Sequence, residues 1–357
     1  MIVFNIVTAI LLKRQDKKTI RMSNRFRKKI MSEIDRIKDG GLVSEKHKRY
    51  LMSRLGRISN MIAFDSMLEK LFSEDEELVH EYLSQLGGVV VYLTLKYGRK
   101  DRIEAAYFPY IIKKYRLIEG QPFSAVIDSM YDLLNESSIY CRENAMQAIY
   151  STGNADFVIK ALKIINDSGS FFHEKILADG LLSFTGDHAE LCGKIINEFD
   201  SFSNEMKVSL MNFLRFDSGD YAEFAFGMLE DDTANDEVRY SCIRYLGKYR
   251  YEPARQYLQR LSDKSSRLKW EYSAIASSAL AIYPGEDTIA LLKRNLYSEN
   301  WYIRFNSSQS LERLGLTYLD LIDVMEGKDR YASEILRYRF DVKKLTEKEG
   351  KAACLTQ

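Results

Sequence analysis

The feature that most constrains the fold of this chain is a pattern that returns every 32 or 33 residues. The recurring position is basic in five of its six occurrences: Arg142, Lys175, Lys207, Arg239, Glu271 and Arg304. Three residues further on the side chain is usually small, and seven further on it is usually aliphatic. Because these spacings share one face of an α-helix, the pattern predicts a series of helices that neighbouring helices approach closely.

A second apolar-periodic segment follows each of these helices after a turn. Five glycines punctuate the turns: Gly153, Gly186, Gly219, Gly285 and Gly315. Pro253 and Pro284 stand where a second helix would begin, and segments such as ADFVIKALKIIN and DTIALLKRNL are apolar at spacings of three and four. One hairpin of this size cannot bury a core, whereas stacked hairpins can. The sequence therefore predicts an all-α fold, a right-handed α-solenoid of stacked helical hairpins over 138–341.

The regions on either side of this array follow a different pattern. Residues 40–137 are apolar-periodic without a clear repeat, which predicts irregular hairpins that cap the array, with Gly87-Gly88 and Pro109 as kinks or breaks. Residues 342–357 are polar and are expected to form a C-terminal tail.

The first twelve residues, MIVFNIVTAILL, form an apolar segment that a basic block follows at once. Between Lys13 and Lys29 the charge is +8, so the rest of the chain carries −7 of the overall +1. We expect no nucleic-acid partner, because a duplex-binding protein should line its fold with positive charge. A twelve-residue helix rises about 18 Å, short of the roughly 30 Å hydrocarbon core, and a secretory signal would place its charge first.

Three interpretations of this N-terminal hydrophobic helix stay open. Residues 1–12 are the end of a longer transmembrane helix, a short anchor held down by acidic lipid headgroups, or a helix that packs on the core. We favour membrane attachment, because an apolar run with a dense basic flank is the positive-inside arrangement, which places the body in the cytoplasm. Residues 13–39 are then expected to form a protruding juxtamembrane helix or linker. Cys141, Cys192, Cys242 and Cys354 have no CxxC pairing, which indicates free thiols in a reducing compartment.

Two stretches of the array, EVRYSCIRYLGKY and WYIRFNSSQSLERLG, resemble HEAT repeats of the armadillo-like superfamily. The resemblance covers about 138–325, and YCRENAMQAIYSTGN and WEYSAIASSALAIY are similar to membrane-anchored bacterial HEAT-repeat proteins. It implies a helical-hairpin fold and little biochemistry, since one fold hosts many functions.

Catalytic signatures are missing from the sequence, so we expect neither an enzyme nor a cofactor: no GxGxxG, GxxxxGK[ST], GxSxG or HExxH occurs. The four histidines are His47, His80, His173 and His188. Two His-Glu dyads loosely resemble those of di-iron HEAT-repeat hydroxylases, but those enzymes need four, so no metal site is expected. HEAT-like bilin lyases and DNA glycosylases keep an enzymatic or small-ligand alternative open by fold analogy, with a nucleic-acid binder third.

The ladder of basic residues admits a structural and a functional interpretation. Arg142, Lys175, Lys207, Arg239 and Arg304 either bind backbone carbonyls and acidic partners in the neighbouring repeat or form a surface for acidic peptides. We favour repeat packing, because residues in repeat register usually serve it.

Aromatic residues crowd the stretch from Tyr240 to Tyr302, with arginines between them. Tyr, Trp and Arg dominate the hot spots of protein interfaces, although core packing accounts for part of such a set. The candidate protein-binding residues are Arg239, Tyr240, Arg244, Tyr245, Trp270, Trp301 and Arg304. The sequence thus predicts a non-catalytic scaffold that is tethered to the cytoplasmic face of a membrane and binds another, membrane-associated protein.

Overall fold

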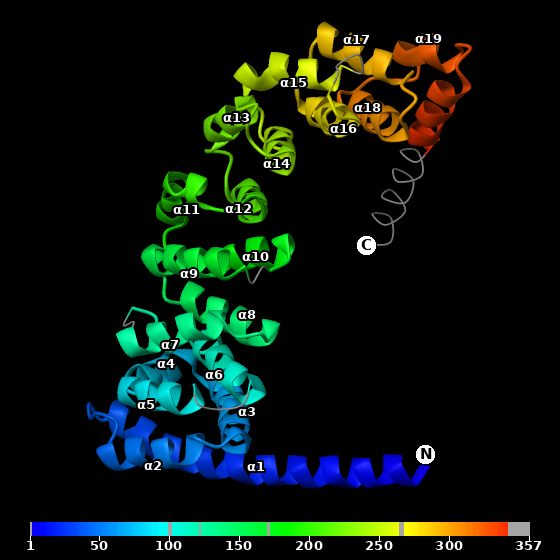
Figure 1. Cartoon of the computed structure of the whole chain (residues 1–357). Coiled ribbons are helices and arrows are strands. Elements are labelled where there is room, and N and C mark those ends of the chain that lie inside the picture. The colour runs from blue at the N-terminus through cyan, green and yellow to red at the C-terminus, as the bar shows by residue number, and fades with distance from the viewer. Residues whose placement is uncertain (1, 99–101, 121–122, 170–171, 264–267, 342–357) are drawn as a thin grey trace. The chain divides into compact units, whose positions relative to one another are not determined.

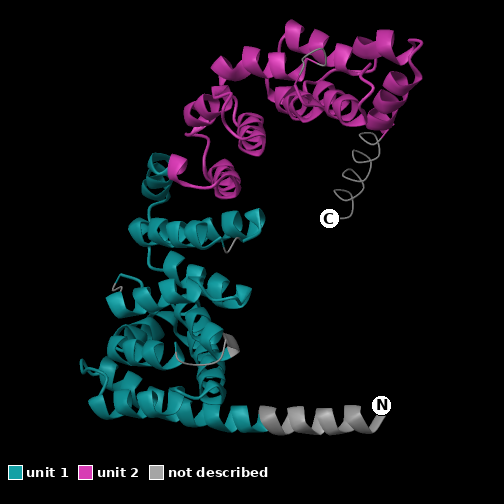
Figure 2. Ribbon diagram, viewed as in Figure 1, with its two compact units in different colours: residues 1–198 teal, residues 199–357 magenta. Residues whose placement is uncertain are grey.

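The computed structural model describes residues 2–98, 102–120, 123–169, 172–263 and 268–341, with side chains from Lys17 in the first helix and from Glu104 in α6. All regular structure in these ranges is helical, which confirms the all-α prediction (Figure 1). The chain divides into two compact units, unit 1 at residues 1–198 and unit 2 at residues 199–357 (Figure 2). The predicted anchor at 1–12 lies outside the described side chains, and the predicted tail at 342–357, with Cys354, lies outside the described residues.

Unit 1 consists of eleven labelled helices. They are α1 Ile2–Lys38, α2 Glu45–Leu55, α3 Ile58–Glu74, α4 Glu76–Ser84, α5 Gly87–Tyr97, α6 Arg102–Lys114, α7 Ser124–Leu134, α8 Ile139–Tyr150, α9 Ala155–Ser168, α10 Glu174–Leu181 and α11 His188–Asn197. They pack in two layers: α6 contacts α8 and α8 contacts α10, while α2, α5, α7, α9 and α11 contact one another in that order. Helix α6 continues through Pro109, so this proline does not end the helix.

Short polar side chains start several of these helices. Asn154 accepts hydrogen bonds from the backbone of α9, and Asp187 accepts from Ala189 and Glu190 at the start of α11, as expected for helix caps. Two turn glycines also meet: a Cβ added to Gly186 would lie 2.2 Å from the carbonyl oxygen of Gly153, which itself has φ of 69°. Glycine at both positions therefore lets two successive turns approach closely.

Helix α1 corrects the prediction of a protruding juxtamembrane helix. Phe26, Ile30, Ile34 and Ile37 are buried, and their spacings of four, four and three place them on one face. This face packs against α3 and α4 inside unit 1. Four large apolar side chains are enough to pack a helix against its neighbours when they share one helical face. The second half of 13–39 therefore belongs to the core of unit 1. In the described part of the chain, no helix combines the length and apolarity needed to cross a bilayer.

Unit 2 repeats the hairpin arrangement in a more regular form. Its helices are α12 Asn204–Asp217, α13 Ala222–Glu230, α14 Asp236–Leu246, α15 Arg255–Ser262, α16 Trp270–Ala279, α17 Glu286–Asn295, α18 Trp301–Arg313 and α19 Ile322–Met325, with a further helix at 330–341. Short 3₁₀ turns occur at Phe199–Ser201, Glu252–Ala254, Leu280–Ile282 and Leu319–Leu321. Each first helix (α12, α14, α16, α18) packs on the next, and α13, α15 and α17 pack on the first helix that follows them.

The recurring small and aliphatic positions lie where the periodicity places them, with two exceptions. All six side chains three residues after the ladder position are buried: Ala145, Ala178, Leu210, Cys242, Ala274 and Ser307. Of the positions seven residues after it, Leu182 is 36% exposed and Ser278 is half-buried. Helix α10 ends at Leu181, so Leu182 stands at its C-cap and leaves the buried face.

Candidate functional site

Three arginines of the basic ladder bind carbonyls close to their own helices. Arg142 donates from Nη1 to the carbonyl oxygens of Glu136 at 2.9 Å and Ser137 at 3.3 Å. Arg304 repeats this geometry in α18, where Nη1 lies 2.6 Å from the oxygen of Ser298 and 3.0 Å from that of Glu299. Both guanidinium groups thus satisfy carbonyls in the loop that leads into the helix, where helical partners run out.

The same guanidinium groups lie over rings that belong to the next repeat. The centroid distances are 5.6 Å from Arg142 to Phe172, 5.2 Å from Arg239 to Tyr272 and 5.3 Å from Arg304 to Tyr331. A cation over an aromatic face is attracted by the ring quadrupole. These arginines therefore connect successive hairpins within each unit, as the packing interpretation requires.

Arg239 is the most enclosed member of the ladder, with 6% of its surface exposed. Its Nε donates to the carbonyl of Leu229 at 3.1 Å, and Nη2 donates to Asp232 and to the hydroxyl of Tyr257, both at 2.9 Å. A partner protein cannot contact this guanidinium, because it is buried and already donates hydrogen bonds to three groups of the chain. The structure thus places Arg239 among the packing residues of unit 2.

The remaining ladder positions are less enclosed. Lys207 lies 3.7 Å from a carboxylate oxygen of Asp200 and 5.6 Å from the ring of Phe199. Lys175 is exposed, and Glu271 is half-buried. The repeat register thus identifies the helical position. The arginines at this position combine hydrogen bonds to backbone carbonyls with a contact to a ring of the next repeat.

The other candidate binding residues separate into buried and exposed groups. Tyr240 and Tyr245 are buried, and the hydroxyl of Tyr245 donates to the carbonyl of Ser218 at 2.6 Å and accepts from the amide of Tyr221 at 3.0 Å. Arg244 is exposed. The two tyrosines belong to the core of unit 2, and because they are buried a partner protein cannot contact their side chains.

The two tryptophans form an exposed stack with residues that the sequence analysis did not select. The ring of Trp270 stacks on Tyr302 at 5.4 Å, Trp301 meets Tyr302 edge-on at 5.2 Å, and Trp301 stacks on Phe305 at 4.9 Å. Trp270, Trp301 and Tyr302 are 44%, 49% and 54% exposed. We call Trp270, Trp301, Tyr302 and Phe305 the aromatic surface.

The position of the tryptophans in their helices explains the aromatic surface. Trp270 is the first residue of α16 and Trp301 is the first of α18, and these two helices pack side by side. A first-turn side chain stands at one end of its helix, and Trp270, Trp301 and Tyr302 are all exposed there. The signal for Tyr302 and Phe305 was present in the sequence, since they lie one and four residues after Trp301.

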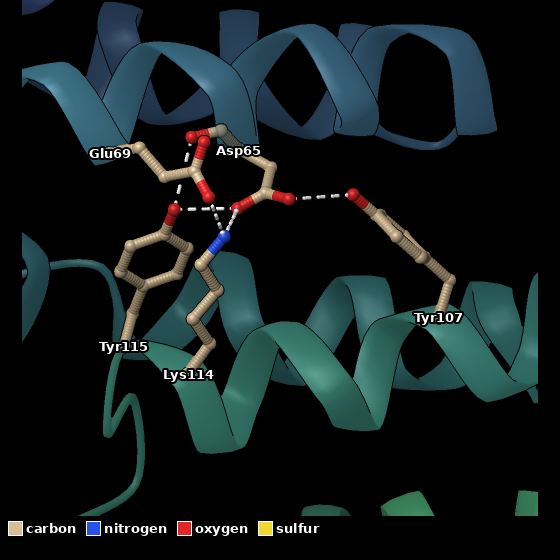
Figure 3. Close-up of polar contacts among 5 residues, drawn as sticks. All are labelled: Asp65, Glu69, Tyr107, Lys114 and Tyr115. Atoms are coloured by element: carbon tan, nitrogen blue, oxygen red, sulfur yellow. Dashed lines mark hydrogen bonds and ion pairs between the residues drawn. The ribbon is translucent and has the colours of Figure 1, made fainter. Parts of the chain in front are cut away.

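A buried polar cluster in unit 1 was also missed from the sequence (Figure 3). Asp65 on α3 accepts from the hydroxyl of Tyr107 at 2.7 Å, from that of Tyr115 at 2.5 Å and from Nζ of Lys114 at 2.7 Å. Lys114 also pairs with Glu69 at 2.5 Å. The only sequence signal is a carboxylate within the apolar run MIAFDSML of α3.

The electrostatics of this cluster hold its protons on the tyrosines and the lysine. Burial and hydrogen bonding to Asp65 raise the pKa values of Tyr107 and Tyr115 well above the ordinary range. Burial alone would lower the pKa of Lys114, but its bonds to Asp65 and Glu69 outweigh this and raise it. At neutral pH the tyrosines therefore stay neutral and the lysine stays charged, so none of these three side chains supplies a nucleophile. It joins α3 to the region of α6.

The histidines occupy separate places. His47 is buried, and its Nε2 lies 2.8 Å from the hydroxyl of Tyr82. His80 stands edge-on to Phe72 at 5.0 Å, while His173 caps α10 by accepting from the amide of Lys175. No group of three or more His, Cys, Asp or Glu side chains within the described ranges is arranged to hold a metal ion. Among the described residues, Cys141, Cys192 and Cys242 are buried thiols outside any disulfide.

The chain was compared with protein-family models and with curated proteins, and neither comparison found a match.

Proposed function

We propose that this chain is a non-catalytic, HEAT-like α-solenoid scaffold, tethered to the cytoplasmic face of a membrane, that binds a membrane-associated protein. The aromatic surface of unit 2 is the observation that carries the proposal. Three large rings that are about half exposed, and packed on one another, form the kind of pre-ordered apolar contact area from which interface hot spots are made. Arg244 is also exposed in unit 2, near the C-terminal end of α14.

The stacking favours a protein partner over an enclosed small ligand. Small-molecule pockets bury most of their ligand between converging walls. Here the rings stack on each other and leave their outer faces in solvent, which suits a broad contact. Arg239 and Arg304 of the ladder support the scaffold part of the proposal, because their hydrogen bonds to backbone carbonyls stiffen the hairpins that present the rings.

The tether rests on the sequence of the N-terminal segment. Residues 1–12 are apolar and the block that follows is basic, which together favour an anchored position beside acidic lipids. A tether would keep the search for a membrane-associated partner within the membrane surface and raise the effective concentration of a weak binder.

The test compares two exposed aromatic sites on the full-length chain in cells that produce it. Trp270→Ala/Trp301→Ala removes the aromatic surface, and Tyr140→Ala removes an exposed ring of α8 in unit 1 that is 71% exposed. After mild crosslinking and detergent extraction, we expect one membrane-fraction protein to co-purify with the wild type and the Tyr140 variant, and to be lost from the double variant. Equal recovery from all three would contradict the proposal. Thermal stabilisation of the wild type alone by a small molecule would point to ligand binding instead.

A further inference from the structure

A cleft between α1 and α2 in unit 1 concentrates positive charge over an aromatic floor. Its volume is about 510 Å³, and Arg25, Lys28, Lys29 and Arg54 line it together with Phe26 and Tyr50. Phe26 is buried, its ring lies 6.0 Å from that of Tyr50, and Nζ of Lys29 lies 4.1 Å from the centroid of Tyr50. We call this the cationic cleft.

The charge in the cationic cleft is not neutralised by the protein. No carboxylate of the described chain pairs with Arg25, Lys28, Lys29 or Arg54, and none lines the cleft. The neighbouring Arg27 shows the contrast, because it points to another face and pairs with Glu74 at 2.7 Å. Two arginines from different helices facing one space are suited to a phosphate, since a guanidinium offers paired donors to phosphate oxygens.

Other clefts of the described chain lack this property. In unit 2, the cleft between α15 and α17 balances Arg260 and Arg294 with Asp263 and Asp287. Another is lined by Lys207 together with Asp200 and Asp231. Of these three clefts, the cationic cleft alone combines four cations with no anion.

The cationic cleft also continues a basic stripe along α1. Lys18, Arg21, Arg25 and Lys28 are exposed and follow one another at spacings of three, four and three, so they share one helical face. The buried residues Phe26, Ile30, Ile34 and Ile37 lie on the opposite face. Between Lys18 and Lys28, helix α1 thus presents cations on one side, while its buried residues from Phe26 to Ile37 fix the other side to unit 1.

We propose that the cationic cleft binds the phosphate of an anionic phospholipid headgroup, with the basic stripe of α1 lying along the membrane surface. This inference rests on the proposed tethering and adds a defined lipid site to it. The basic stripe favours a lipid surface, because Lys18 and Arg21 extend the cations beyond the cleft along one helical face, where a bilayer presents many anionic headgroups. A free inorganic phosphate would use the cations of the cleft alone.

The test uses the full chain and vesicles of two compositions, phosphatidylcholine alone and phosphatidylcholine with phosphatidylserine. Arg25→Gln/Arg54→Gln removes two cations from the cationic cleft, and Lys70→Gln/Lys113→Gln removes two exposed cations elsewhere in unit 1. Each cation near an anionic bilayer contributes about five-fold to binding, so we expect about a 25-fold loss for the cleft variant on anionic vesicles. The matched control should lose much less, and neither should change binding to neutral vesicles.

Several outcomes would overturn the lipid site. Equal losses for the two double variants would show general charge attraction, and equal wild-type binding to both vesicles would show that the apolar segment acts without headgroup selection. If inorganic phosphate at millimolar concentration, or a nucleic-acid duplex, displaced the chain from anionic vesicles, the cleft would serve a soluble phosphate or a polynucleotide. Failure of the wild type to bind either vesicle would contradict the tether itself. An unchanged thermal midpoint in each variant shows that the fold is retained.

Discussion

Unit 1 and unit 2 stabilise similar helical hairpins with different buried polar groups. In unit 1 the carboxylate of Asp65 collects three donors and lies outside the repeat register. In unit 2 the guanidinium of Arg239 lies in register, and a neutral network adds to it, with Ser262 and Ser277 hydroxyls 2.9 Å apart and the Asn295 amide 2.7 Å from the Ser262 carbonyl. The regular hairpins are thus stabilised by an arginine that recurs in repeat register, whereas the irregular hairpins depend on a cluster around Asp65 that does not recur.

The two units also carry different proposed binding surfaces. Unit 1 presents the cationic cleft, and unit 2 presents the aromatic surface. The predictions below test whether the two units depend on the groups named here.

The largest effect is expected for Asp65→Ala in unit 1. The change leaves Lys114 with the exposed Glu69 as its ion-pair partner and removes the carboxylate acceptor of the half-buried Tyr107 hydroxyl. The buried Tyr115 hydroxyl keeps only the backbone carbonyl of residue 65. Breaking one partner of such a buried pair costs about 3–5 kcal/mol in the free energy of unfolding. Hydrogen exchange in α3 and α6, with urea unfolding, measures the loss. Glu69→Ala removes a carboxylate that is 58% exposed and should cost less than about 1 kcal/mol, so similar losses for the two variants would contradict this assignment.

An intermediate effect is expected for Arg239→Met in unit 2. Methionine keeps much of the apolar stem but leaves the Leu229 carbonyl and the Tyr257 hydroxyl without their donor. The expected cost is about 2–3 kcal/mol, confined to exchange in α13, α14 and α15. Arg244→Met on the same helix changes an exposed side chain and should stay within about 0.5 kcal/mol. If the two variants were equally stable, the ladder arginine would not be a packing residue.

The smallest effect is a pH dependence that belongs to unit 1 alone. Burial lowers the pKa of His47 below 6.5, Lys29 adds to this and Glu33 partly opposes it. As the pH is lowered below about 6.5, His47 therefore binds a proton in the unfolded chain while it resists protonation in the folded unit. The free energy of unfolding decreases as the pH is lowered, until the pKa of His47 in the folded unit is reached. All four histidines lie in unit 1, so unit 2 lacks this contribution.

Hydrogen exchange, corrected for intrinsic rates, measures this slope in α2 and α4 and compares it with α14 and α16 between neutral and mildly acidic pH. His47→Gln should remove the part of the slope that the wild type shows near pH 6. A slope that survives in the variant, or that appears equally in unit 2, would assign the acid sensitivity to other groups.

Much of the hairpin pattern was predictable from sequence, because small and aliphatic side chains at fixed spacing can serve only one helical face. Ala145, Ala274 and Leu311 are buried as that pattern requires. The packing of α1 was missed because its four apolar residues are diluted by cations on the opposite face. Periodicity also marked Arg239 and Tyr240 without showing that they are buried, since exposure depends on which helix covers a position.

The site residues were less predictable for a physical reason. The aromatic surface depends on Trp270 and Trp301 standing at the first turns of two neighbouring helices, which composition cannot show. The cationic cleft joins α1 to Tyr50 and Arg54 of α2, and the Asp65 cluster joins residues 42 to 50 positions apart. Such sites arise from tertiary packing, so a local pattern in the sequence does not reveal them.

The most direct measurement is photocrosslinking in cells, with a photoreactive aromatic amino acid at position 301, 22 or 140 of the full-length chain and mass spectrometry of the adducts. Position 22 lines the cationic cleft without contributing a charge, and an aromatic probe at position 301 keeps a ring there. A membrane-tethered scaffold with the two surfaces described here predicts a protein adduct from position 301, a phospholipid adduct from position 22, and neither from position 140. The same adducts from all three positions, or no protein adduct from position 301, would contradict it.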